Sequence, residues 1–66
     1  MTNQEAIEFG AASARMAIDT KGEWESLQYS LDVYRENVRE TLKDFNAVEH
    51  EEDAFRAFDA AAIVAK

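Results

Sequence analysis

Apolar residues recur along the middle of the chain at alternating spacings of three and four. Eight positions follow this alternation, and only one of them is polar. They are Trp24, Leu27, Leu31, Tyr34, Val38, Thr41, Phe45 and Val48. This spacing places them on one stripe of a helix and is typical of a helix that packs lengthwise against another helix. The pattern predicts a long helix over about residues 23–46, in which Leu42 can cover the polar position.

The large members of this stripe are the expected core, shared between the flanking helices and a second subunit. They are Trp24, Leu27, Leu31, Tyr34, Val38 and Phe45. A chain of 66 residues has a marginal core of its own. Small domains usually gain stability from disulfides, a metal or oligomerisation. Because the chain has no cysteine and a single histidine, we expect a homodimer or a higher homo-oligomer.

An Ala-rich segment precedes the long helix and predicts a first helix over about residues 3–19. Thr2 or Asn3 can cap its N-terminus, and Glu5 in the first turn favours the helix dipole. Helical spacing places Ile7, Ala11, Ala14 and Ile18 on one face. The many small side chains indicate either close packing against another helix or only the high helix propensity of alanine.

The link near residues 19–23 has two interpretations. Gly22 can end the first helix in a left-handed conformation. Alternatively, Thr20 and Glu23 form a capping box that opens the second helix. The sequence leaves both open.

A third helix is predicted over about residues 51–66, with a break or kink between 46 and 52. Asn46 followed by Glu49 makes a serviceable capping arrangement. If the heptad phase is continued from Val48, its next positions fall on Glu52, Phe55 and Asp59, so the apolar stripe is lost. The chain has 47% hydrophobic residues, two glycines and no proline, which favours long helices and short links. We therefore predict one all-α domain over residues 1–66, a short–long–short three-helix bundle completed by oligomerisation.

The stretch from Val48 to Asp53 holds the only histidine, His50, among four acidic residues. These carboxylates and the imidazole are a possible ligand set for a divalent ion, but acids also suit the positive end of a helix dipole, and we favour that second interpretation. No catalytic motif is present, so we expect no catalytic residue, no bound metal and no cofactor. An imidazole changes charge at about pH 6.5, which makes His50 a candidate pH-sensitive junction.

The net charge is −7, and the acidic residues are spread along the chain. Such a surface repels nucleic-acid phosphates and anionic lipids, so we expect no direct binding to nucleic acid or membrane. The longest apolar run, residues 60–65, is far shorter than the roughly 20 residues of a membrane span. The N-terminus lacks the basic region and apolar core of a secretory signal, so we expect a soluble, cytoplasmic protein.

A second contact surface is possible on the long helix, away from the apolar stripe. Tyr29 and Val33 are four residues apart and lie beside Glu36 and Arg39. A lone surface tyrosine is ordinary, and that alternative stays open. If these four residues do form a surface, it is a candidate site for a protein partner.

The leading hypothesis is a non-catalytic module that binds a protein partner and regulates or inhibits it. Small regulators, antitoxin-like modules and phage-encoded inhibitors of host machinery share this build, which is an argument from type alone. One alternative is an acidic inhibitor that mimics nucleic acid. Another is an oligomer that sequesters a nucleotide between an aromatic ring and Arg15, Arg35 or Arg39. A structural subunit of a larger assembly is a further alternative.

Overall fold

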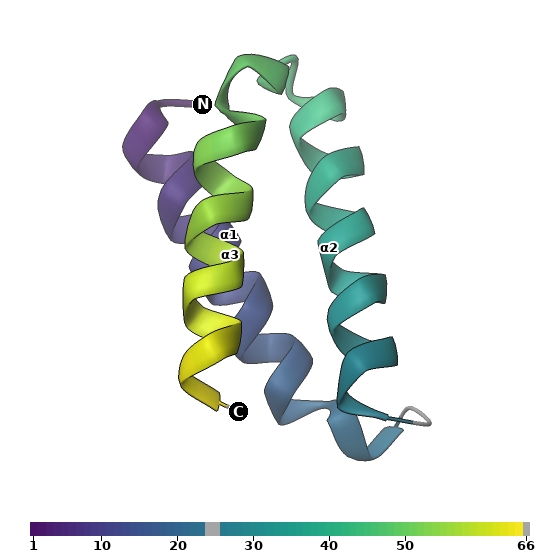
Figure 1. Cartoon of the computed structure of the whole chain (residues 1–66). Helices are drawn as coiled ribbons and strands as arrows, with labels where there is room; N and C mark the ends of the chain where they lie inside the picture. Colours follow the sequence, from purple (N-terminus) through teal and green to yellow (C-terminus); the bar gives the residue numbers. More distant parts are fainter. Residues whose placement is uncertain (24–25, 66) are drawn as a thin grey trace.

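Three α-helices run alternately down, up and down the molecule, as the computed structural model shows (Figure 1). They are α1 (Asn3–Asp19), α2 (Leu27–Asp44) and α3 (Glu51–Ala65), with short 3-10 turns η1 (Lys21–Glu23) and η2 (Val48–His50) in the links. The structure describes residues 1–23 and 26–65, with side chains up to residue 63. Within these residues all regular structure is helical, which confirms the predicted all-α class.

A complete capping box starts α1. The Glu5 backbone N–H donates to Thr2 Oγ1 at 3.1 Å, and the Thr2 N–H donates to Glu5 Oε1 at 2.8 Å. The bond from the Thr2 backbone N–H, and after it the Thr2 side chain, hold the pKa of the Glu5 carboxyl below its ordinary value of 4.5. Because the folded state lowers this pKa, the box contributes stability above that value and loses it as acid protonates Glu5.

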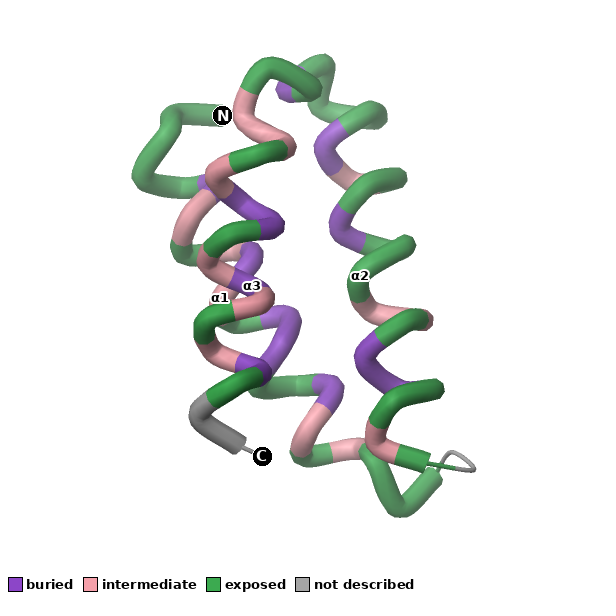
Figure 2. The backbone as a smooth tube through the Cα atoms, viewed as in Figure 1, coloured by how far each residue is buried: buried purple, intermediate pink, exposed green. Residues whose placement is uncertain are grey.

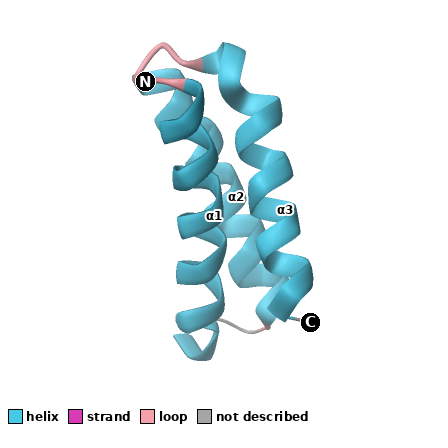
Figure 3. Cartoon of the chain, turned by 90° about the vertical axis from the view of Figure 1, so that its left-hand side faces the viewer, coloured by secondary structure: helices cyan, strands magenta, loops and turns pink. Residues whose placement is uncertain are grey.

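The buried face of α1 consists of its smallest residues. They are Ala6, Gly10, Ser13, Ala14 and Ala17. Of the residues that helical spacing places on one face, Ala14 is buried, whereas Ile7, Ala11 and Ile18 are half-buried. The reason is the close approach of α3: a Cβ atom added to Gly10 would overlap the carbonyl oxygen of Ala54. Figure 3 shows the two helices side by side in front of α2. Of the two explanations for the small residues, the structure supports close packing.

The end of α1 follows neither interpretation of the link. The φ angle of Gly22 is not positive, so it is not a left-handed stop. The Thr20 hydroxyl donates back to the Met16 carbonyl at 2.9 Å instead of capping the next helix. Only a backbone bond joins Glu23 N–H to the Thr20 carbonyl, at 2.9 Å. The link is thus a short 3-10 turn, and the predicted capping box is absent from it.

Ser26 starts α2 by accepting a hydrogen bond from the Tyr29 backbone N–H at 3.1 Å. The helix therefore begins at Leu27, four residues later than predicted. Trp24, expected in the core, lies outside the described residues. Ser30, one turn into the helix, is fully buried, and its hydroxyl donates to the Ala17 carbonyl at 2.7 Å. This bond satisfies one of the last carbonyls of α1 and ties α2 to it.

A Schellman motif ends α2. Asn46 has a φ of 55°, its N–H donates to the Lys43 carbonyl at 3.1 Å, and the Ala47 N–H donates to the Leu42 carbonyl at 2.7 Å. Ala47 and Leu42 are each only 1% exposed, which supplies the apolar contact typical of this motif. The predicted break is confirmed. The role given to Asn46 was wrong, because it terminates α2 in the left-handed region and does not cap α3.

The core lies between the three helices of a single chain. The buried positions of α2 face the other two helices (Figure 2). Leu31 and Val38 are buried as predicted, and Leu27 and Tyr34 are partly buried against them. Phe45 lies outside the core of the single chain, because α2 ends one residue before it and it is 64% exposed. Its predicted contact with a second subunit stays a prediction. The residues that complete the core include Leu42, Phe55 and Phe58.

The close approach of α1 and α3 predicts an unusual response to alanine. Gly10→Ala should lower the free energy of unfolding by about 1–3 kcal/mol, because the added methyl overlaps the α3 backbone. Helix propensity alone would favour alanine by about 1 kcal/mol. A loss of stability therefore indicates the overlap with α3, and a gain indicates helix propensity alone. Urea denaturation followed by circular dichroism measures it. Gly22→Ala is the control: nothing lies within 4 Å of its added Cβ, and its effect should stay within about 0.5 kcal/mol. A Gly10→Ala variant as stable as the parent would contradict the packing.

Candidate functional site

Two arginines on α2 hold α3 against it. Arg35 Nη1 lies 3.0 Å from Asp59 Oδ1, and Arg39 Nε lies 3.3 Å from Glu51 Oε1. Between these ion pairs both guanidinium groups approach the Phe55 ring, at 4.6 Å for Arg35 and 5.7 Å for Arg39. Each exposed ion pair contributes little, but the cation–π contacts add to both. The side of α2 that carries the arginines therefore serves the fold.

This arrangement places Arg39 at the edge of the partner surface predicted for it. Arg39 bridges Glu36 on its own helix, at 3.5 Å, and Glu51 on α3. It thus lies at the border between the outer face of α2 and the contact with α3. Sequence reasoning found its neighbour Glu36 but could not find Glu51 or Phe55, because both come from another helix. The same contacts engage Arg35 and Arg39, two of the three arginines considered for nucleotide binding.

The outer face of α2 carries a shallow hollow bordered by exposed side chains. Tyr29 is 47% exposed, and Val33, one turn further, is half-buried. We define the outer face by the residues that line a shallow hollow of about 540 Å³, together with Tyr29. These lining residues are Val33, Tyr34, Glu36, Asn37 and Glu40. The predicted surface residues Tyr29, Val33 and Glu36 thus lie on one face, with Arg39 at its edge.

Acidic side chains follow the outer face along its length. Asp32, Glu36, Glu40 and Asp44 are spaced four residues apart, and all four are exposed. At 1.5 Å of rise per residue, neighbours in this row are about 6 Å apart along the helix axis. Arg39 partly neutralises Glu36, while no cation lies within ion-pair distance of the other three among the described residues. Apolar and aromatic groups therefore lie within a predominantly negative surface.

The acidic stretch around His50 lies at the junction of α2 and α3. His50 ends η2, and its Nε2 atom lies 3.6 Å from Glu49 Oε1. Glu51, Glu52 and Asp53 form the first turn of α3, where they face the positive end of the helix dipole. Among the residues that the structure describes, no three histidine or acidic side chains come together as a metal site. The placement of His50 at the junction is as expected, and its pH response stays a prediction.

Comparison of the chain with protein families, curated proteins and solved structures finds no match in any of the three. Within the described residues, no helix combines the length and apolar content that crossing a bilayer requires. The support for the candidate site therefore comes from the geometry of α2.

Two valines on α2 distinguish its outer face from its inner face. Val38→Ser should lower the free energy of unfolding by at least about 2 kcal/mol, because Val38 is fully buried and the change leaves a cavity and a hydroxyl in the core. Val33→Ser should change it by less than about 1 kcal/mol, because that side chain lines an open hollow. Thermal unfolding of both variants measures the difference. Equal losses would mean that Val33 belongs to the core and not to a free surface.

Proposed function

We propose that the chain is a non-catalytic module that binds a protein partner and thereby regulates or inhibits it. The observation that carries this proposal is the outer face of α2, where Tyr29 and Val33 lie within a row of carboxylates. Interfaces commonly use a tyrosine anchor with an apolar neighbour and a polar rim. Because the rim is acidic and the whole chain carries a net charge of −7, the expected partner presents a basic surface around an apolar contact.

The row of carboxylates supports nucleic-acid mimicry as a second candidate function. Asp32, Glu36, Glu40 and Asp44 form a regular line of negative charge on one helix. A basic cleft that binds a phosphate backbone would attract such a line. In this case the partner would be a nucleic-acid-binding protein. The chain and nucleic acid would then compete for the same basic cleft. The interspersed basic residues Arg39 and Lys43 weigh against it.

Other expectations have less support. Nucleotide sequestration would need Arg35 or Arg39 to leave Phe55 and its ion pairs, which makes it the weaker hypothesis. Self-association stays a prediction, since the buried core lies among three helices of one chain. The structural-subunit, soluble and cytoplasmic readings stay predictions too.

The test is capture of a partner by the immobilised protein from a lysate of the source organism, with identification by mass spectrometry. Val33→Asp should weaken the captured interaction by about tenfold, because it places a charge in the apolar hollow. Reversal of the row by Glu36→Lys with Glu40→Lys should weaken it similarly through repulsion of a basic partner. The affinity of the purified pair is then measured by calorimetry at low and moderate salt.

A matched reversal on another helix controls for net charge. Glu8→Lys with Asp19→Lys changes the charge equally, but on exposed positions of α1. This control should leave affinity nearly unchanged. Equal weakening by both reversals, with none from Val33→Asp, would contradict a specific outer face. Competition by nucleic acid, with steep loss of affinity at moderate salt, would favour mimicry instead.

A further inference from the structure

A groove of about 370 Å³ lies between α2 and α3, away from the centre of the outer face. Its apolar lining includes Leu31 from α2 with Phe58 and Ala62 from α3, which are 4%, 2% and 7% exposed. Ile63 forms an exposed wall, with 69% of its surface accessible to solvent. The volume is at the lower end of the range for small-ligand sites, about 300–1,000 Å³. The groove can therefore cover the apolar part of one side chain or small molecule.

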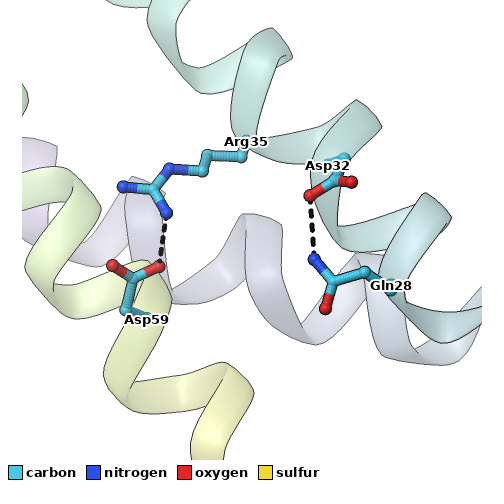
Figure 4. Close-up of polar contacts among 4 residues, drawn as sticks. All are labelled: Gln28, Asp32, Arg35 and Asp59. Carbon is cyan, nitrogen blue, oxygen red and sulfur yellow. Dashed lines mark hydrogen bonds and ion pairs between the residues drawn. The ribbon is translucent and has the colours of Figure 1, made fainter.

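Two polar pairs border this apolar lining (Figure 4). Arg35 crosses from α2 to Asp59 on α3, with 3.0 Å between Nη1 and Oδ1. Along α2, Gln28 Nε2 donates to Asp32 Oδ1 at 2.9 Å. Asp32 thus has a neutral amide as its partner, and no cation lies within ion-pair distance of it in the described part of the chain. Two carboxylates against one guanidinium leave the rim negative.

This combination identifies the chemistry of an occupant. An anion would be repelled by Asp32 and Asp59, and Arg35 is already engaged by Asp59 and Phe55. A purely apolar group would leave the Asp32 carboxylate beside it without a cation. Lysine and arginine side chains have both parts that the groove offers to contact: an apolar stem and a cationic end that binds carboxylates.

We infer that the groove between α2 and α3 receives a lysine or arginine side chain of the protein partner, with the stem against the exposed Ile63 and the cation at Asp32. This inference rests on the proposed function and specifies the partner further. Asp32 and Glu36 are one helical turn apart, so the groove borders the outer face along α2. A basic partner can contact both surfaces at once.

The groove can be tested without the partner. The probes are N-acetyl-arginine amide and N-acetyl-lysine amide, with the uncharged N-acetyl-norleucine amide as the comparison, titrated into ¹⁵N-labelled protein and followed by NMR. The basic probes should shift the amide signals of Leu31, Asp32, Phe58 and Ala62, and norleucine amide should bind more weakly. Asp32→Asn should weaken the basic probes by about threefold to fivefold, as expected for one exposed ion pair.

Two further variants make the result decisive. Asp44→Asn removes the same charge elsewhere on α2 and should leave the affinity for the basic probes unchanged. Ile63→Ser should weaken all three probes, because it removes the exposed apolar wall. Equal weakening by Asp32→Asn and Asp44→Asn, or shifts spread over all acidic residues, would overturn the inference. So would equal binding of norleucine amide. Failure of partner capture with a positive titration would refute the proposed function and leave the groove as a site for cationic side chains.

Discussion

The distance between α1 and α3 at Gly10 governs the rest of the structure. Because Gly10 has no side chain, the α3 backbone at Ala54 can lie directly against it, and the neighbouring alanines of α1 are buried on the same face. Because α1 and α3 pack this closely, they form a base for α2 with little room for large side chains between the two helices. The larger core residues therefore meet α2, where Leu31, Val38 and Leu42 are buried in one cluster with Phe58.

The position of α2 on this base divides its surface. The buried Ser30 hydroxyl ties it to α1, while Arg35 and Arg39 over Phe55 tie it to α3. These contacts use its inner side and the side facing α3. On the opposite side lies the outer face with Tyr29 and Val33, followed by the acidic row and bordered by the groove at Asp32. One helix thus completes the bundle and also offers the surfaces that we propose for a basic partner.

The sequence predicted features that are determined by local patterns, and it predicted less well those that are determined by tertiary contacts. Apolar periodicity and breaks in its phase predicted the three helices and a break between residues 46 and 52. In the sequence, the apolar stripe continues through Phe45. Periodicity does not indicate that Asn46 adopts a left-handed conformation and that α2 ends one residue before Phe45. It also favoured the larger residues of α1, whereas close packing selects the smallest.

The candidate site shows the same division. Tyr29, Val33 and Glu36 could be placed on one face because they share a helix. The contacts of Arg39 with Glu51 and Phe55, and the groove formed with Phe58 and Ala62, need the relative placement of α2 and α3, which no local pattern contains. A capping serine at residue 26 was a recognisable signal, but the apolar stripe that begins at Trp24 concealed it.

The most direct test of the account is a nuclear Overhauser spectrum of the labelled protein in solution. Contact of the α1 and α3 backbones predicts strong cross-peaks from the Gly10 α-protons to the α- and methyl protons of Ala54. Absence of these cross-peaks would show that the α1 and α3 backbones do not meet at Gly10 and that α1 packs through its larger residues. That result would contradict the close approach on which the placement of α2 and its outer face depends.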